Sequence, residues 1–380
     1  MDEKFDYNNI LNEKKIKIYS KTSYNEAEVI EKYKNGEYRI VTEQARYPLD
    51  KMEEIFSNYV LQPEYQRRRV WDTKKKSKLI ESFIINVPIP PIFLYEYEYS
   101  EYEVMDGLQR ITTILSFLKN DFRLEGLELW EELNGKQYDE LPDEIKAGIN
   151  RRYVSAIILL KETASTSDKE MWMKKFVFER LNTGGMTLSP QEIRNALYSG
   201  ELNTRIISMA EMGLFKEMWG LMDENYIRRM EDCELVLRFL AYKSAIENNI
   251  TKSTAKVLDN YSELTTDLDS SNVDTLEKLF KSTVQASHHL FGINAFKSNI
   301  KNKNSEKMIY DTIMLSVAKF MEKNPEIDIF KFENNILEEK KYEIIEKYKE
   351  SDFNGKYTAL SVVRKRVEIF EKFLEKNLNG

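Results

Sequence analysis

Apolar residues in the first half of the chain follow the periods of both strands and helices. Ile92–Tyr95 and Tyr102–Met105 are short β-type runs, and the polar stretch Glu98–Glu101 between them predicts a β-hairpin. The continuous aliphatic run Val154–Leu160 predicts a strand that is covered on both faces. Helices are expected among these strands at Leu49–Asn58, Thr73–Asn86 and Gln109–Leu118.

After about Asp168 the apolar residues recur almost only at helical spacing. Three sets show it: Leu235, Phe239, Tyr242 and Ile246; Ile309, Ile313 and Phe320; and Val363, Val367, Phe370 and Leu374. The polar stretch Asn248–Asn272 predicts a long connection. We therefore expect an α/β domain followed by an all-helical domain.

Three segments follow from this pattern. Residues 1–35 are polar and charged, and predict an arm with one helix around Glu26–Tyr33. Residues 36–200 form the expected α/β domain, and residues 201–380 form the expected helical domain. A chain of 380 residues is long enough for each domain to bury its own core.

Charge and cysteine content exclude several classes of protein. A net charge of −7 is unsuited to a general nucleic-acid coat protein, so any nucleic-acid contact must be local. The single cysteine, Cys233, excludes an internal disulfide and a cysteine-based zinc cluster, and we expect it to be buried. The start Met1–Lys4 lacks the order of a signal peptide, and no apolar run approaches the roughly 20 residues that span a bilayer. We expect a cytoplasmic protein without membrane contact.

A glycine stands between a predicted strand and a predicted helix. Gly107 follows Val104–Met105 directly, and helical spacing begins after it. The unpaired N–H groups and positive dipole of a helix start favour a phosphate there. Arg110 lies within reach of the same anion, Thr112 adds a hydroxyl, and Asp106 could cap the helix or hold Mg²⁺. The alternative is a plain capped helix start with Arg110 in a surface ion pair.

Four blocks of sequence resemble the N-terminal-domain family of the GmrSD-type restriction endonucleases. In chain order they are Gln62–Arg67 with Trp71, Pro88–Ile92, Asp106–Arg110, and Phe178–Gly185 with Glu192–Ala196. The resemblance covers about residues 38 to 200. The third block usually reads Asp-Gly-Gln-Gln-Arg in the family, whereas Leu108 stands here for the first glutamine, which puts hydrolysis in more doubt than binding.

The resemblance implies a ParB/sulfiredoxin-like fold that binds and hydrolyses a nucleoside triphosphate (NTP) with Mg²⁺, in bacterial restriction-type defence against phage. Asp106, Gln109 and Arg110 would be catalytic, with Asp106 also the metal ligand. The nucleotide-binding candidates are Gly107, Arg110, Gln66, Arg67, Thr112, Arg180, Asn182, Arg194 and Asn195. Ser189, Pro190 and Glu192 additionally predict a capping box at the start of a helix.

Basic residues concentrate in residues 61–80. This segment contains only two acidic residues, Glu64 and Asp72, so its net charge is 7 − 2 = +5. Its basic residues are Arg67, Arg68, Arg69, Lys74, Lys75, Lys76 and Lys78. Asp72 predicts a helix N-cap, and lysines directly after it are unfavourable for the helix dipole. DNA phosphates are candidate partners for Arg68, Arg69, Lys74, Lys75 and Lys76. A solvated helix surface is the alternative for the lysines.

Many members of the family carry a C-terminal HNH nuclease domain, and we find no such pattern here. The two histidines, His288 and His289, are adjacent and diverge by about 100° on a helix, so they are poorly placed to share a metal. Ser361, Arg364 and Arg366 suggest a small basic edge on the helical domain.

Two functions remain open, with a phosphotransferase as a third and weaker one. The first is an NTPase of a restriction system, in which DNA cleavage comes from the α/β domain or a partner. The second is a non-catalytic sensor of nucleotide or DNA that acts through a partner effector protein.

Overall fold

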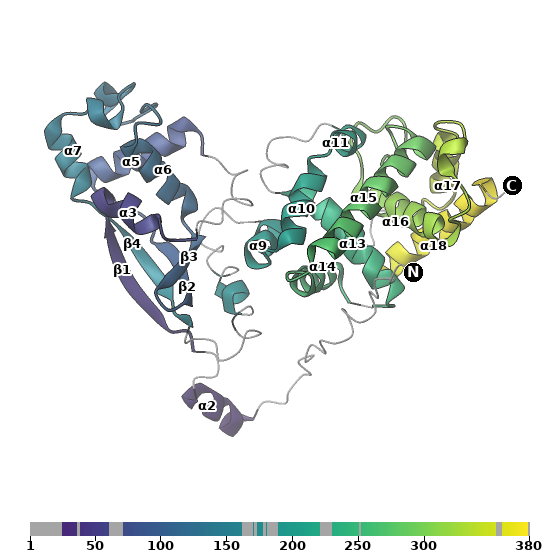
Figure 1. Cartoon of the computed structure of the whole chain (residues 1–380), viewed down its shortest axis with the longest axis horizontal. Helices are drawn as coiled ribbons and strands as arrows, with labels where there is room; N and C mark the ends of the chain where they lie inside the picture. Colours follow the sequence, from purple (N-terminus) through teal and green to yellow (C-terminus); the bar gives the residue numbers. More distant parts are fainter. Residues whose placement is uncertain are drawn as a thin grey trace. The chain divides into compact units, whose positions relative to one another are not determined.

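The computed structural model describes residues 25–35, 39–60, 71–161, 170, 173–177, 180, 189–220, 230–250, 252–354 and 359–378 of the 380-residue chain. They fall into two compact units, which divide between Leu188 and Ser189. The first is a mixed α/β unit and the second is helical (Figure 1). The mixed α/β part and the helical part are both as the hydrophobic pattern predicts.

A four-stranded sheet forms the centre of the α/β unit. Its strands are β1 (Thr42–Pro48), β2 (Ile92–Glu98), β3 (Glu101–Asp106) and β4 (Tyr153–Leu159), in the order β1-β4-β2-β3. β4 runs parallel to β2 and antiparallel to β1, and β2 and β3 form the predicted hairpin. β1, a largely exposed edge strand without an aliphatic run, has no counterpart among the predicted strands.

Helices cover one face of this sheet (Figure 1). They are α3 (Met52–Phe56), which follows the 3-10 turn Leu49–Lys51, then α5 (Thr73–Ile85), α6 (Leu108–Leu118) and α7 (Asp143–Asn150). Ile92 and Ala156 of the sheet share a core with Ile111, Ile114 and Phe117 of α6, and each of these residues is at most 1% exposed to solvent. The helix α2 (Glu26–Lys34) also forms, as predicted, and buries none of its residues.

The opposite face of the sheet is covered less completely. Lys174 lies over the ring of Tyr95 at 4.0 Å, and its Nζ is 3.0 Å from Glu103 Oε1. In β4, burial alternates between Ala156, which is buried, and Ile157, which is half-buried. β4 is therefore covered on both faces, as predicted, but more completely on the helix-bearing face, since Leu159 of the other face is buried while Ile157 is only half-buried.

The helical unit is built around aromatic side chains. Its helices are α9 (Pro190–Leu197), α10 (Glu201–Ala210), α11 (Gly213–Trp219), α13 (Glu231–Glu247), α14 (Thr254–Leu264), α15 (Ser270–Phe291), α16 (Lys307–Lys323), α17 (Glu338–Lys347) and α18 (Leu360–Leu378). Phe215, Phe280 and Tyr310 meet at the centre and are fully buried. The three apolar repeats predict α13, α16 and α18 correctly.

Two expectations about this unit were wrong. The polar stretch 248–272 contains the helix α14, because Val257, Leu258 and Tyr261 supply a buried face to it. Arg366 is 2% exposed and lies near the buried Asp311, so it cannot belong to a basic surface edge. Cys233 is buried, as expected. No helix in the described residues is long and apolar enough to cross a membrane.

Candidate functional site

The junction between β3 and α6 has the predicted strand–glycine–helix geometry. β3 ends at Asp106, Gly107 takes φ 102°, and α6 begins at Leu108. Ile111 N donates to Gly107 O at 3.0 Å, which closes the first turn. No side chain in the described part of the chain caps this helix start, so the dipole of α6 is not neutralised by an N-cap group.

Packing explains why glycine occupies position 107. Gly107 is buried, and a Cβ there would lie 2.4 Å from Ile92 Cγ2 and 3.0 Å from Arg110 Nη2. The positive φ adds a second constraint, because L side chains rarely adopt that region. Fold requirements thus account for this glycine without a ligand.

Arg110 is held at the corner by an ion pair. Its Nη2 lies 2.7 Å from Asp106 Oδ2 and 3.3 Å from the Pro91 carbonyl oxygen. The Arg110 side chain is 15% exposed, whereas that of Asp106 is 53% exposed. The Nε of Arg110 is buried and has no partner among the described residues. This is the ion pair of the alternative interpretation, with a carboxylate that water reaches.

Gln109 and Thr112 have local contacts. Gln109 Oε1 accepts a hydrogen bond from Trp71 N at 3.2 Å, and so fixes the chain just before α5. Thr112 is exposed, and its hydroxyl donates to Gln109 O at 3.3 Å. Gln109 therefore positions the entry to α5 next to the Gly107 corner.

Several predicted site residues lie outside the described part of the chain. They are Gln66, Arg67, Arg68, Arg69 and Asn182. Arg180 is described and exposed, with its guanidinium 4.2 Å from the ring centre of Phe176. Its role in nucleotide binding stays a prediction.

Arg194 and Asn195 have structural roles inside the helical unit. Arg194 is 5% exposed, and its guanidinium lies 2.8 Å from Asp259 Oδ1 and 3.4 Å from Glu234 Oε2. Asn195 is fully buried and donates to the sulfur of Met230. The helix that carries them, α9, starts with the predicted capping box at Ser189. These contacts commit both side chains to the helical unit, and their role in binding a ligand stays a prediction.

The lysines at the start of α5 rest on neighbouring side chains. Asp72 caps the helix as predicted, accepting from Lys75 N at 2.7 Å. Lys75 Nζ lies 4.9 Å from the ring of Trp71, and Lys76 Nζ lies 5.5 Å from the ring of Phe122. These contacts leave the ammonium groups near the protein surface. They are compatible with a solvated helix and with phosphate binding, so both interpretations of the lysines stay open.

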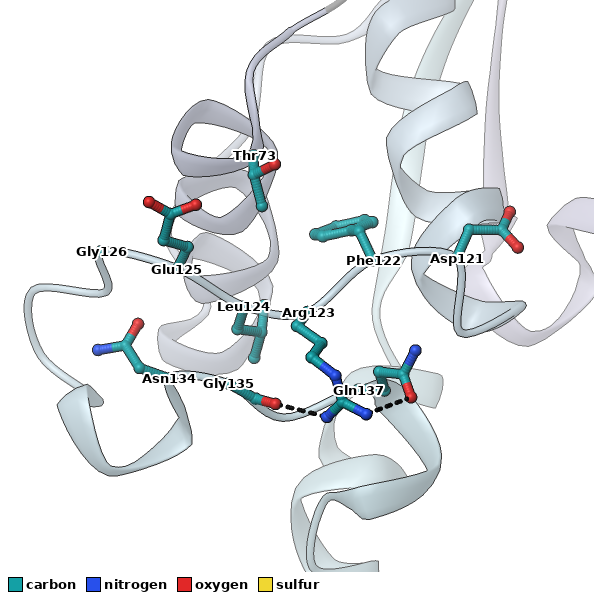
Figure 2. A pocket seen from close by; sticks show the side chains of 10 residues that line it. All are labelled: Thr73, Asp121, Phe122, Arg123, Leu124, Glu125, Gly126, Asn134, Gly135 and Gln137. Atoms are coloured by element: carbon teal, nitrogen blue, oxygen red, sulfur yellow. Dashed lines mark hydrogen bonds between the residues drawn. The ribbon is translucent and has the colours of Figure 1, made fainter.

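A hollow adjoins this helix start, and no sequence pattern indicated it. It has a volume of about 720 Å³ and is lined by Thr73, Asp121, Phe122, Arg123, Leu124, Glu125, Gly126, Asn134, Gly135 and Gln137. In Figure 2, Arg123 points toward Gly135 and Gln137, to which it donates at 2.7 and 3.2 Å. A further bond of 2.8 Å joins it to Glu140. Arg123 thus holds the loop between α6 and α7 in place through Gly135, Gln137 and Glu140. Asp121 and Glu125 add negative charge to the lining of the hollow.

Glu81 of α5 ties the same loop to the helix. Its carboxylate accepts from the backbone N–H groups of Glu128, Leu129 and Trp130, at 3.0, 2.7 and 3.0 Å. Burial alone would raise the pKa of Glu81, but these bonds outweigh it and lower the pKa. A glutamate at a buried helix position was the available signal in the sequence, and the sequence reasoning missed it.

Metal binding stays a prediction. Within the ranges that the structure describes, no group of three or more His, Cys, Asp or Glu side chains could hold a metal ion. The two histidines are half-buried, and His289 Nε2 lies 2.9 Å from the Phe332 carbonyl oxygen.

Comparison with known proteins gives one match. Residues 52–199 match a family model described as the GmrSD restriction endonuclease, N-terminal domain. No curated protein and no solved structure matches the chain. The matched range contains the Gly107 corner, the basic start of α5 and the start of α9.

Proposed function

We propose that this chain is the nucleotide-binding component of a bacterial restriction-type defence system that acts on or senses DNA, because residues 52–199 match the family model of the GmrSD restriction endonuclease N-terminal domain. Its α/β unit would be a ParB/sulfiredoxin-like domain that holds the NTP phosphates at the Gly107 corner. The observation that carries the proposal is a helix start without a side-chain cap, beside an arginine whose counter-ion is exposed.

The corner offers two sources of attraction for a phosphate. The first N–H groups of α6 and the positive end of its dipole favour an anion. Arg110 supplies a guanidinium that can bind phosphate oxygens in a bidentate manner. Since the Asp106 carboxylate contacts Arg110 Nη2, the phosphate would replace that carboxylate. Replacement is feasible because Asp106 is 53% exposed and gains hydration on release.

Asp106 would then be available for a cation. Mg²⁺ in nucleotide sites is bound by one or two carboxylates together with phosphate oxygens, and one exposed carboxylate suits that donor set. The ion would neutralise charge on the phosphates. Gln109 keeps α5 beside the corner through its bond to Trp71.

The test is a thermal-shift titration of the full chain with ATP, GTP, CTP and UTP, each with Mg²⁺. A ligand at 100 times its Kd stabilises the folded state by about 2.7 kcal/mol, so we expect a clear shift with at least one nucleotide. Arg110→Ala should lose the shift. Arg46→Ala, at an exposed arginine on β1, should retain it. No shift with any nucleotide, or an equal shift in Arg110→Ala, would remove the proposal.

Phosphate release separates an NTPase from a sensor. The Arg110–Asp106 pair favours the sensor as a second candidate, because it holds the predicted catalytic acid in place. Turnover that rises with DNA and disappears in Arg110→Ala would support the enzyme. Binding without turnover would support a sensor that acts through a partner effector.

A further inference from the structure

The helical unit contains a groove lined by residues of α17 and α18. Figure 1 labels both helices near the C-terminal end of the chain. We call it the α17–α18 groove. It is lined by Lys340, Glu343, Ile344, Lys347, Tyr348, Asp352, Lys365, Glu368, Ile369, Lys372, Phe373, Lys376 and Asn377. Its volume is about 880 Å³, within the range of clefts that bind ligands or peptide side chains.

The lining residues form one stripe on each helix. On α18, Lys365, Lys372 and Lys376 are separated by seven and four residues, which places them on one side of the helix. On α17, Lys340 and Lys347 are separated by seven. Ile344 and Ile369 are half-buried between the stripes and Phe373 is 9% exposed, so the floor of the groove is apolar and its rims are basic.

Some lysines of the helical unit form ion pairs, whereas the rim lysines do not within the part of the chain that the structure describes. Lys319 lies 2.6 Å from Glu371 and Lys307 lies 3.2 Å from Glu231. Among the described residues, none of Lys340, Lys347, Lys365, Lys372 and Lys376 forms an ion pair within 4.0 Å. Lys340 donates to Asn377 instead, and Lys347 lies over the ring of Tyr348.

Unpaired lysines of like charge repel one another, and their arrangement in an acidic protein suits an anionic partner. The rims carry five lysines against Glu343, Asp352 and Glu368, a balance of 5 − 3 = +2, in a chain whose net charge is −7. A partner with carboxylates would complete these ion pairs, and the apolar floor would take its hydrophobic side chains.

We propose that the α17–α18 groove binds an amphipathic helix of a partner protein, with large apolar side chains on one face and carboxylates along its flanks. From Lys365 to Lys376 the stripe is roughly 16 Å long, which matches about three turns of such a helix. A nucleic-acid backbone fits less well. Phosphates gain nothing from the apolar floor of Ile344, Ile369 and Phe373, whereas leucines of a partner helix would be buried there.

The test uses the full chain and a fluorescein-labelled peptide of about 16 residues, with leucines at positions i, i+4, i+7 and i+11 and glutamates flanking them. Fluorescence anisotropy should show saturable binding of this peptide and none of a scrambled peptide of equal composition. The variant Lys365→Glu/Lys372→Glu/Lys376→Glu should weaken binding by at least about tenfold.

Three control variants separate binding in the groove from an effect of net charge, from loss of folding and from the nucleotide site. Lys256→Glu/Lys301→Glu/Lys303→Glu makes the same change of net charge at exposed positions outside the groove, and should bind within about twofold of wild type. Ile369→Ser should also weaken binding without changing charge, and circular dichroism checks that each variant stays folded. Arg110→Ala should bind the peptide normally, so failure here is distinct from failure of the nucleotide proposal.

Several outcomes would overturn the proposal. They are no peptide binding, equal binding of the scrambled peptide, or equal weakening by the two charge-reversal variants. Binding of a labelled DNA duplex, lost in the Lys365→Glu/Lys372→Glu/Lys376→Glu variant while the peptide does not bind, would assign the groove to nucleic acid and exclude a helical partner.

Discussion

The starts of α6 and α9 present two helix N-termini with a nearby arginine, and they differ in how completely their polar groups are satisfied. At α9, Ser189 accepts from Glu192 N and the Glu192 carboxylate accepts from Ser189 N. At α6, no described side chain caps the first turn. A satisfied start stabilises one conformation, whereas an uncapped start retains the field that attracts an anion.

The two arginines show the same contrast. Arg194 is 5% exposed and contacts carboxylates that are 17% and 24% exposed, while Arg110 is 15% exposed and its carboxylate is 53% exposed. Arginines inside family motifs are therefore not equivalent. Exposure of the counter-ion indicates which arginine can exchange partners, and sequence cannot reveal that exposure.

The strongest test of the α6 start is Gly107→Ala. A left-handed φ costs a non-glycine residue about 1–3 kcal/mol, and the overlap with Ile92 costs about 1–3 kcal/mol more. We expect a loss of about 4 kcal/mol in the free energy of unfolding, measured by urea denaturation without ligand. Gly148→Ala, in α7 with open space around the new Cβ, should be neutral or stabilising by up to about 1 kcal/mol. A tolerated Gly107→Ala would mean that this corner is looser than its packing indicates.

Arg194→Ala should come next in size. Its removal leaves Asp259 and Glu234 without their guanidinium partner in a partly buried setting, and breaking buried pairs costs about 3–5 kcal/mol. We expect about 3 kcal/mol by chemical denaturation, because both carboxylates keep some contact with water. A cost below about 1 kcal/mol would place Arg194 with the exchangeable arginines and favour its role as a ligand residue.

The sequence predicts those parts of the fold whose apolar residues repeat. The hairpin of β2 and β3, and the helices α13, α16 and α18, follow from alternation or helical spacing. β1 has no such signal, because an exposed edge strand gains its place from pairing with β4 rather than from apolar side chains. α14 was missed because only three of its residues are buried.

The candidate site divides in the same way. The turn at Gly107 and the caps at Asp72 and Ser189 were predictable, since local backbone chemistry determines them. The partners of Arg194 lie 40 and 65 residues away in sequence, so no local pattern indicates them. Glu81, with three backbone donors from a distant loop, was hidden for the same reason.

Substitution of Glu81 tests whether a buried acid of the α/β unit contributes as much to the free energy of unfolding as Arg194 does in the helical unit. Glu81→Gln keeps the shape but removes the charge from three N–H bonds, and bonds to charged groups contribute about 1.5–3 kcal/mol. We expect a loss of about 2 kcal/mol near neutral pH. Because the folded-state pKa is lowered, this contribution is fully present above the ordinary value of 4.5 and is lost as pH falls through the folded-state pKa. The difference in free energy of unfolding between the two proteins should therefore shrink as pH falls below 4.5, and a difference that stays constant with pH would contradict the assignment.

The smallest expected effect on stability, from Arg110→Ala, decides how the comparison is interpreted. An ion pair with a half-exposed carboxylate contributes below about 1 kcal/mol, so the variant should unfold close to wild type in urea. Asp106→Asn should behave alike, and high salt should change neither curve strongly. If Arg110→Ala instead costs about 3 kcal/mol, Arg110 is a structural arginine like Arg194, and lost nucleotide binding in that variant would reflect a damaged corner. A small cost in the free energy of unfolding, together with a lost nucleotide shift, can arise only if the guanidinium contributes more to a ligand than to the fold.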